Sequence, residues 1–472
     1  MRFFHLLLAA TLAYTSIPEG QAKSLTGDRA LLVLPKATEA KPEDYGRFVE
    51  SLKSRGFSVT FQTATSNKLN LFVYGERQFD HLVLLAPKAK RLGNGITAKS
   101  LVEFIDDGGN IVMAAGSDFG GAQRDFAKQL GIDFDLRGNV AVDHFHYLPA
   151  PETEAGVRDP ENHTRILTDQ YTNSTYIVGD QVRQGGPILY QGVGHRHMTN
   201  SQPTMLWSVL TGYPTTYSFD TSEGQVVTSK DSLLSGSKMH LVSAFQARNN
   251  ARVMVVGSTS LFSDAFFATP VPSSTVLTSP KPNGNDQFVR DLTEWTFQEK
   301  SVVRVNSVSY HVVGPNESDE KKESNPSANP GSFRVSDRIK YSINLSEYYA
   351  DQWHPAQVNQ LQFEAVMLDP YVRQTLEAES RTGTAAVYSQ IIDLPDVYGV
   401  FTFKVDFLRR GLSHVKHTDV VPILPFKHNE YDRYLVSAYP YYISAGSLMV
   451  SFLVFCGIWI FNGDSTIKVK KS

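Results

Sequence analysis

Short apolar runs and amphipathic segments alternate along the first part of the chain, in the order expected of strands and helices. Residues 29–34 form a short apolar run, as is typical of a buried parallel strand, and three further segments are predicted strands: residues 57–61, 81–85 and 110–114. Between them, residues 43–55 and 97–107 carry apolar side chains at helical spacing, and each of these segments ends at a glycine. This strand–helix–strand repetition predicts an α/β fold with an N-terminal doubly wound domain.

The middle of the chain is less regular. Residues 240–246 and 251–257 have the composition of two strands, and the tight connection between them includes Asn250. Asparagine tolerates the left-handed backbone that such turns need. Residues 286–300 place apolar side chains, among them Trp295, at helical spacing. This spacing predicts an amphipathic helix whose apolar stripe belongs to the core.

After Ser301 the pattern changes to strands without helices. Residues 399–407 are the clearest case, because Phe401 and Phe403 alternate with polar residues, as in a strand with one buried face. Three further segments have the same character: 339–345, 358–367 and 387–394. We therefore expect a C-terminal β-sandwich domain of about 130 residues, in which the polar segment 314–332 forms a solvent-exposed loop.

Both ends of the chain carry membrane signals. Arg2, the apolar stretch 3–13 and the small residues before Lys23 have the arrangement of a cleavable signal peptide, residues 1–22. Residues 442–461 contain no charge, and twenty such residues are enough to cross a bilayer as a helix. Because the basic residues that follow remain on the cytoplasmic side, we expect a single-pass type I protein of the endoplasmic-reticulum membrane, with most of the chain in the lumen.

These patterns divide the chain into five parts. They are a signal peptide (1–22), a lumenal α/β region (23–300), a lumenal β-sandwich domain (301–434), a transmembrane helix (442–461) and a cytoplasmic tail (462–472). The net charge of -3 provides no basic field for nucleic acid. The sole cysteine, Cys456, lies within the expected membrane helix, so the lumenal part must be held together by core burial without disulfides.

Short motifs in the tail and in the lumenal part fit this compartment. Lys468 and Lys470 precede the end of the chain at the spacing of a di-lysine retrieval signal. Four Asn-x-Ser/Thr sequons are candidate glycosylation sites: Asn162, Asn173, Asn316 and Asn344.

A search for catalytic chemistry finds no complete set of residues. Residues 116–121 follow a predicted strand, but they match neither the dinucleotide fingerprint nor the phosphate-binding P-loop. Asp118 and Asp264 each follow a predicted strand and are the best candidates to face a crevice at the strand ends. The α/β part is glutamine-amidotransferase-like, but that chemistry needs a cysteine nucleophile at a strand-to-helix turn, where this chain has none.

Two histidine clusters are the remaining candidates for a metal site. His144 and His146 form one pair, and His195 and His197 form the other. Two positions apart on a strand, the rings of a pair lie on one face, as in some metal sites. No acidic or histidine partner at a telling spacing completes either set, so a surface or packing role is favoured. We expect no catalytic residue, cofactor or metal ion in this chain.

Longer stretches of sequence are similar to a known family. Residues 245–253 (FQARNNARV) and 257–267 (GSTSLFSDAFF) resemble its central signature, and residues 394–407 (LPDVYGVFTFKVDF) resemble its β-domain signature. Residues 437–442 (SAYPYY) resemble the entry to its membrane helix. The similarity is colinear from about Arg29 to Tyr442. The family is the 48 kDa subunit of the oligosaccharyltransferase complex.

The resemblance implies a role without chemistry of its own. It implies a non-catalytic subunit that supports transfer of an oligosaccharide from dolichyl diphosphate to Asn of Asn-x-Ser/Thr. Its implied partners are the catalytic multi-pass subunit, ribophorin II and the defender-against-death subunit. The alternatives are a lumenal carbohydrate-binding or carbohydrate-processing protein, which a crevice of converging acids would favour, and a type I cargo receptor.

Overall fold

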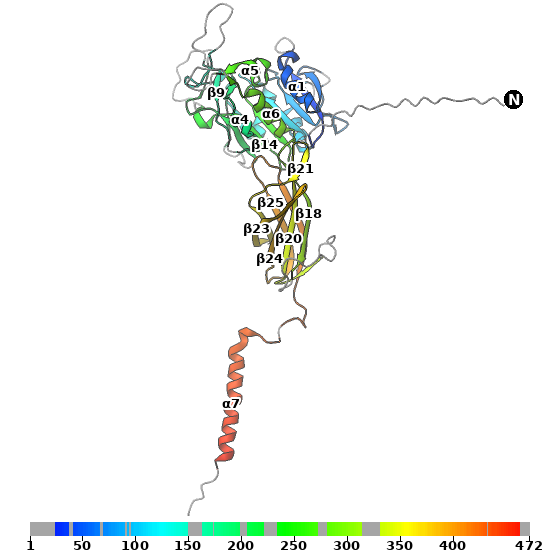
Figure 1. Cartoon of the computed structure of the whole chain (residues 1–472), viewed down its shortest axis with the longest axis vertical. Coiled ribbons are helices and arrows are strands. Elements are labelled where there is room, and N and C mark those ends of the chain that lie inside the picture. The colour runs from blue at the N-terminus through cyan, green and yellow to red at the C-terminus, as the bar shows by residue number, and fades with distance from the viewer. Residues whose placement is uncertain are drawn as a thin grey trace, which may run out of the picture.

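The computed structural model of the chain comprises two units and a separate helix (Figure 1). It describes residues 24–36, 41–66, 69–89, 92–93, 96–149, 163–172, 174–198, 205–220, 234–271, 281–313, 331–431 and 433–462. We call residues 24–296 the α/β unit, residues 297–301 the connecting segment and residues 302–426 the β unit. The two units meet at a narrow waist, and helix α7 (Tyr439–Phe461) stands apart from both (Figure 1).

The α/β unit is built on a sheet of nine strands among the described residues. Five parallel strands form its first part, in the spatial order β2 (Ser58–Thr63), β1 (Arg29–Leu34), β5 (His81–Leu84), β6 (Asn110–Ala114) and β15 (Arg252–Val256). The remaining strands are antiparallel: β14 (His240–Gln246), β11 (His195–His197), β7 (Ile132–Phe134) and β12 (Leu206–Thr211).

Helices cover both faces of the parallel strands. On one face, α1 (Gly46–Ser54) and α6 (Asn285–Thr296) share a core with Leu32 and Leu34 of β1. On the other face, α2 (Ala98–Asp106) and α3 (Gly121–Gln129) share a core with Leu31 and Val33. Successive residues of β1 therefore alternate between two cores. This burial on both faces explains why the inner strands β1, β5, β6 and β15 are largely apolar. The edge strand β2 is mostly exposed and mixes polar with apolar residues.

Shorter elements complete the α/β unit. The strands are β3 (Phe72–Val73), β4 (Glu76–Arg77), β8 (Asn139–Val142), β9 (Ile166–Thr168), β10 (Ile188–Tyr190), β13 (Tyr217–Asp220), β16 (Pro270–Val271) and β17 (Lys281–Pro282). The helices are α4 (Asp180–Arg183) and α5 (Asp264–Ala268). The strands pair in antiparallel twos outside the main sheet: β3 with β4, β8 with β13, β9 with β10 and β16 with β17.

The β unit contains strands and no α-helix in the residues that are described. Its strands are β18 (Val302–Val312), β19 (Phe333–Arg334), β20 (Arg338–Tyr349), β21 (Gln352–Pro355), β22 (Leu361–Met367), β23 (Asp369–Thr382), β24 (Ala385–Asp393), β25 (Gly399–Phe407) and β26 (Val415–Leu424). They follow the order β18-β20-β24-β23-β22-β25-β26-β19, and β21 pairs with the end of β20. The long strand β23 pairs with β22 through its first half and with β24 through its second half.

An aromatic core fills the β unit. Phe403 is fully buried, with its ring centroid 5.3 Å from that of Phe363, 5.6 Å from Tyr310 and 6.1 Å from Phe333. Its neighbour Thr402 is only half-buried. The alternation that the sequence predicts over residues 399–407 is therefore confirmed, because every second side chain points into this core.

Two boundaries predicted from the sequence are wrong. The helix expected over residues 286–300 ends at Thr296, because Gln298 has a φ of 58°, which is incompatible with a right-handed helix. The strand expected from residue 358 begins at Leu361, after Gln360 with a φ of 61°. The expected loop over residues 314–332 lies almost wholly outside the described residues.

Helix α7 is the one described helix that is long and apolar enough to cross a membrane. Its 23 residues correspond to about 35 Å, slightly more than the thickness of a bilayer core. None of its apolar side chains is buried against the rest of the chain. Cys456 is a free cysteine within it. An apolar helix without a protein partner is consistent with a single membrane span.

Candidate functional site at the junction of the two units

The connecting segment between the two units is buried and polar. Gln298, Glu299, Lys300 and Ser301 are all less than one-tenth exposed. Gln298 and Ser301 have φ values of 58° and 59°, in the left-handed region that L-residues seldom adopt. Segments that join domains are ordinarily exposed and flexible. Because this segment is buried and has a defined backbone conformation, it forms a rigid connection. We call the connecting segment and the side chains that bind it or the adjoining loop of the β unit the joint.

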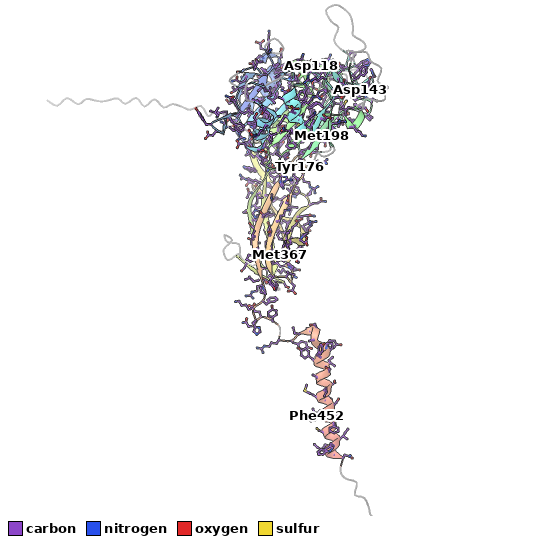
Figure 2. All side chains as sticks on the ribbon, turned by 180° about the vertical axis from the view of Figure 1, so that it is seen from behind. Asp118, Asp143, Tyr176, Met198, Met367 and Phe452 are labelled. Carbon is purple, nitrogen blue, oxygen red and sulfur yellow. The ribbon has the colours of Figure 1, made fainter. Side chains whose placement is uncertain are left out.

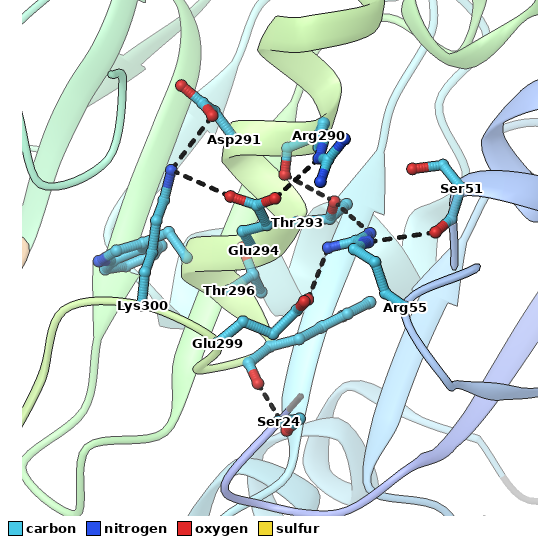
Figure 3. A network of polar contacts seen from close by, with 12 residues as sticks. Ser24, Ser51, Arg55, Arg290, Asp291, Thr293, Glu294, Thr296, Glu299 and Lys300 are labelled. Carbon is cyan, nitrogen blue, oxygen red and sulfur yellow. Dashed lines mark hydrogen bonds and ion pairs between the residues drawn. The ribbon is translucent and has the colours of Figure 1, made fainter. Parts of the chain in front are cut away.

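Ion pairs hold the connecting segment against the α/β unit (Figure 3). The Arg55 guanidinium lies 2.5 Å from the Glu299 carboxylate and also donates to Thr293 Oγ1 at 2.9 Å. Lys300 Nζ lies 3.3 Å from Asp291 and 3.6 Å from Glu294. Removing one member of a buried pair is costly because its partner then remains as an uncompensated buried charge.

Arg252 lies at the centre of the joint. Its guanidinium donates to the carbonyl oxygens of Trp295, Lys300 and Ser301 at 2.7–2.9 Å, and to Ser413 Oγ of the β unit at 3.3 Å. It also lies over the Trp295 ring, 4.8 Å from its centroid. Complete burial lowers the pKa of Arg252 to about 9, so the side chain remains charged at neutral pH. One arginine thus holds helix α6, the connecting segment and the β unit together.

Three further side chains of the α/β unit bind the loop before β26. Gln246 Nε2 donates to Leu412 O at 2.9 Å, and Trp295 Nε1 donates to Gly411 O at 2.8 Å. The Asn250 side chain accepts from the backbone N–H of His414 at 2.7 Å. Asn250 has a φ of 70°, which confirms the left-handed turn predicted from the sequence. Gln246, Asn250 and Arg252 all lie in the signature formed by residues 245–253. The hydrogen bonds of this signature therefore help to form the joint.

A cleft opens beside this joint. It has a volume of about 950 Å³, and residues of both units line it, among them Tyr176, Glu347, Tyr349, Gln352, His354 and Arg381. Strand β21, which contributes two of these residues, lies at the waist of the molecule (Figure 1). Cavities of this size at a domain junction are where ligands commonly bind.

The hairpin of β20 and β21 forms one wall of the cleft. Glu347 is paired with His354, and Tyr349 with Gln352. Because side chains alternate along a strand, these four lie on one face of the hairpin, and all four line the cleft. The turn between the strands consists of Ala350 and Asp351, with φ values of 50° and 64°, as in a type I′ turn.

The other face of the hairpin is braced by packing. Tyr348 and Trp353 are paired across the strands, with ring centroids 5.2 Å apart. The Arg304 guanidinium of β18 stacks on the Trp353 ring at 3.7 Å from its centroid. This packing holds the hairpin, so the side chains that face the cleft project from a fixed backbone.

Tyr176 of the α/β unit contributes to the facing wall and lies at the waist (Figure 2). Its carbonyl oxygen accepts from Ser301 Oγ at 3.0 Å, and its side chain packs against the core of the β unit. Gly411 leaves room for it, because a Cβ at Gly411 would approach Tyr176 Cβ to 2.9 Å. Tyr176 is therefore held by the same contacts that form the joint.

The cleft contains one carboxylate without an ion pair among the described residues. Burial raises the pKa of Glu347, opposed by the backbone N–H of Gln357 and by the charge of His354. Burial also raises the pKa of Tyr176, with a further contribution from the Glu347 charge. Arg381 supplies a guanidinium at the rim. The cleft thus contains hydrogen-bond donors, hydrogen-bond acceptors and aromatic rings. Its positive and negative side chains balance each other.

Comparison with known proteins gives the family. The family model described as "OST48, N-terminal domain" matches residues 21–299, and the one described as "OST48 middle domain" matches residues 317–463. This chain belongs to the OST48 family. The first match includes Gln246, Asn250 and Arg252 of the joint, and the second includes the hairpin of the cleft.

Named relatives are similar over nearly the whole chain. The dolichyl-diphosphooligosaccharide–protein glycosyltransferase 48 kDa subunit of Danio rerio is 34% identical over 93% of both chains. The glycosyltransferase subunit wbp1 of Schizosaccharomyces pombe is 35% identical over 88% of this chain and 89% of its own. The 48 kDa subunit of Arabidopsis thaliana is 32% identical over 92% of this chain and 93% of its own.

The two crevice carboxylates predicted from the sequence have separate contacts within this OST48 family member. Asp264 Oδ1 accepts from the backbone N–H of Arg47 at 3.0 Å, near the N-terminus of α1, where an anion stabilises the helix. Asp118 is exposed and lies 3.8 Å from Lys88 Nζ. Asp118 and Asp143, a carboxylate discussed below, project from different parts of the α/β unit (Figure 2). Neither predicted carboxylate lines the cleft described above.

The first histidine pair is not on a strand. Residues 144–146 form a bend, which the Asp143 carboxylate fixes by accepting from the backbone N–H groups of Phe145 and His146. His144 contacts His163 and Tyr217 OH, whereas the His146 ring stacks on Tyr213, 3.9 Å between centroids. The two rings therefore have different neighbours, and the strand geometry considered from the sequence is wrong here.

The second pair is on a strand and shares a partner. His195 Nε2 and His197 Nε2 lie 2.7 and 2.8 Å from Ser243 Oγ, and His240 stacks on His197 with centroids 4.0 Å apart. Burial lowers the pKa of His197 to about 3 and that of His240 to about 4, and it also lowers the pKa of His195. No cluster suited to a metal ion occurs among the described residues. The sequence analysis did not include His240 in this cluster.

The candidate modification sites fall mostly outside the described residues. Asn162, Asn173 and Asn316 lie there, as do Lys468 and Lys470. Asn344 is described: it is half-buried in β20, and its Oδ1 accepts from Asn306 Nδ2 at 3.4 Å. Glycosylation and retrieval therefore stay predictions.

Sequence reasoning missed the residues of the cleft. Glu347, Tyr349, Gln352 and His354 belong to no catalytic motif. The available signal was local: residues 347–349 and 352–354, on the two sides of Ala350 and Asp351, are all polar or aromatic. Nothing in that pattern indicates that Tyr176, far away in the sequence, completes the wall.

Proposed function

We propose that this chain is a non-catalytic subunit of an oligosaccharyltransferase complex, which transfers an oligosaccharide from dolichyl diphosphate to Asn of Asn-x-Ser/Thr. The observation that carries the proposal is identity of 32–35% with proteins named as subunits of that glycosyltransferase, over about nine-tenths of each chain. Similarity over that length includes both the joint and the cleft. The role is to support assembly and activity of the complex.

The contacts of the best catalytic candidates support a role without chemistry. Asp264 is engaged by a helix N-terminus, and Asp118 lies at the surface beside Lys88. A general acid or base must reach the proton that it transfers. These contacts give each carboxylate a structural or surface role in this chain.

The proposed topology is that of a type I protein of the endoplasmic-reticulum membrane. Helix α7 would be the membrane span, with a lumenal part in two domains, 23–300 and 301–434, and a cytoplasmic tail, 462–472. The parallel sheet with helices on both faces supports a doubly wound first domain. The aromatic core enclosed by β18–β26 supports a β-sandwich as the second.

Affinity purification in mild detergent tests the proposal. We expect the tagged chain to recover the catalytic multi-pass subunit, ribophorin II and the defender-against-death subunit, together with transfer of oligosaccharide to a sequon peptide. Recovery of the chain with cargo proteins and without glycosyltransferase subunits would contradict the proposal and favour a cargo receptor.

A further inference from the structure

We propose that the cleft between Tyr176 and the hairpin of β20 and β21 binds an uncharged oligosaccharide. The inference rests on the proposed function. The names of the relatives contain a lipid, a diphosphate, an oligosaccharide and a protein. Each of these needs a different kind of site, and the lining of the cleft distinguishes among them.

The exposed ring of Tyr349 offers a surface for the apolar face of a sugar. Tyr349 is 59% exposed, although it lines a cavity, and the His354 ring lies near it with centroids 6.3 Å apart. A tyrosine ring combines a flat apolar body with a polar tip, and this suits a ligand whose rings have both apolar and hydroxyl-bearing sides. A half-exposed tyrosine on a braced hairpin can bind without losing much side-chain entropy.

Planar polar groups line the same cleft as this ring. Glu347 offers carboxylate oxygens as acceptors, Arg381 offers guanidinium donors, and Gln352 offers both from one amide. Glu347 is held by the backbone N–H of Gln357, which leaves its remaining acceptor positions for a ligand. Hydroxyl groups act as both donor and acceptor, so they match a mixed set of this kind. A site built to hydrogen-bond a hydroxyl rejects ligands that lack it.

The other chemistries fit the cleft less well. A diphosphate needs several cationic groups or a row of N–H donors, whereas the single guanidinium of Arg381 is accompanied by the carboxylate of Glu347. A lipid chain needs a continuous apolar wall, whereas charged and amide side chains line this cleft. The volume of about 950 Å³ is at the upper end for ligand sites. It suits a molecule of several rings.

The joint preorganises the cleft. Its walls come from two units, and Arg252, Asn250 and Trp295 fix how those units meet. A binding site divided between mobile domains would have to be ordered when the ligand binds, at a cost in affinity. Here the connecting segment is buried and ion-paired, so the walls are already in position.

A titration of the full-length chain in detergent micelles tests the inference. The probes are a fluorescent uncharged oligosaccharide of several sugar rings and a fluorescent peptide with an Asn-x-Thr sequon, each followed by polarisation. We expect saturable binding of the oligosaccharide that weakens at least ~tenfold in Tyr349→Ala, through loss of the ring surface. Tyr349→Phe keeps the ring and remains within about twofold of the wild type.

The matched control is Tyr398→Ala, which removes a tyrosine of similar exposure (68%, against 59% for Tyr349) elsewhere in the β unit and leaves affinity unchanged. If Tyr349→Ala does not fold, Gln352→Ala carries the test with the same expected direction. Equal affinity of the cleft variants and the wild type, or no binding of the oligosaccharide, overturns the inference. So does binding of the peptide alone with loss in Tyr349→Ala, which would make the cleft a peptide site. Co-purification of the other subunits is measured separately, so failure here leaves the proposed function standing.

Discussion

The connecting segment and the cleft are both rich in polar residues and lie side by side at the waist, yet they differ in where their polar groups point. In the connecting segment, Glu299 and Lys300 contact charged side chains, and the Lys300 and Ser301 carbonyls accept from Arg252. In the cleft, Glu347 and Arg381 face open space. Buried polar groups that satisfy one another stabilise and specify a structure, whereas polar groups left at a cavity are available to a ligand. The connecting segment therefore stabilises the structure, whereas the cleft is suited to bind a ligand.

Arg252→Met would break the joint most strongly. It removes the guanidinium donor of three backbone carbonyls, of which the Trp295 and Ser301 oxygens keep a backbone N–H donor, and it removes a buried cation from the Trp295 ring. We expect the free energy of unfolding to fall by about 3–5 kcal/mol, because several hydrogen bonds from a charged donor are lost. Urea unfolding of the full-length chain in detergent measures this. Arg248→Met is the matched control, because Arg248 belongs to the same signature but is exposed, and it should change stability by less than about 0.5 kcal/mol. Similar losses for the two variants would contradict the role of Arg252.

Two substitutions of Asn250 separate the contribution of its backbone conformation to stability from that of its side-chain hydrogen bond. Asn250→Ala loses the hydrogen bond to His414 N and places a Cβ residue at a φ of 70°. We expect a loss of about 2–3 kcal/mol in unfolding free energy. Asn250→Gly keeps the backbone conformation without strain, so it should lose about 1 kcal/mol less. The same urea series provides the measurement, and equal losses would show that backbone strain is not part of the cost.

Acid should destabilise the α/β unit through the histidines around Ser243. Burial lowers the pKa of His197 to about 3 and that of His240 to about 4 in the folded chain, against about 6.5 when unfolded. The unfolded chain therefore binds more protons between those values. The stability contributed by the neutral rings is complete above pH 6.5 and is lost as the pH falls toward 4.

His197→Asn should make the loss between pH 6.5 and 5 shallower by about 1 kcal/mol per pH unit. Unfolding free energy measured as a function of pH checks this. Between pH 7.5 and 8.5 the curves of variant and wild type should run parallel, because the histidines are neutral in both states there. Parallel curves also below pH 6.5 would exclude His197 as a source of the effect.

The smallest effects are expected for the two candidate crevice carboxylates. Asp118→Asn and Asp264→Asn should leave transfer to a sequon peptide almost unchanged when it is normalised to the co-purified catalytic subunit. Removal of a general acid or base lowers the rate about a hundredfold or more. A normalised loss of activity above tenfold for Asp118→Asn or Asp264→Asn would contradict the non-catalytic role.

Asp264→Ala should lower the free energy of unfolding by about 1 kcal/mol, because α1 loses a carboxylate near its N-terminus.

The sequence predicts regular elements well where periodicity is strong. Strands β1 and β6 are apolar runs because both of their faces are buried, and residues 399–407 alternate because one face is buried. The prediction fails at Thr296, where apolar spacing continues but left-handed backbone at Gln298 ends the helix. Periodicity reports which face is buried, and it contains no information about such a break.

The candidate site is less predictable because it depends on contacts between residues far apart in the sequence. Arg252 was recognised within a signature, but its partners Trp295, Ser301 and Ser413 come from three other segments. The cleft likewise needs Tyr176 opposite a hairpin that begins beyond residue 337. No local pattern specifies such pairings, which follow from the way the two units meet.

The most direct test of the contrast between joint and cleft is a paired measurement of unfolding free energy and oligosaccharide affinity for Asn250→Ala and Tyr349→Ala. The account predicts opposite outcomes. Asn250→Ala lowers the unfolding free energy by about 2–3 kcal/mol. Arg252 and Trp295 still hold the two units together in this variant, so the protein that remains folded binds the oligosaccharide nearly as the wild type does. Tyr349→Ala changes stability by less than about 0.5 kcal/mol and weakens binding at least ~tenfold. A variant series in which affinity simply follows stability, or in which Tyr349→Ala alters neither, would contradict the division of the waist into a stabilising joint and a recognition cleft.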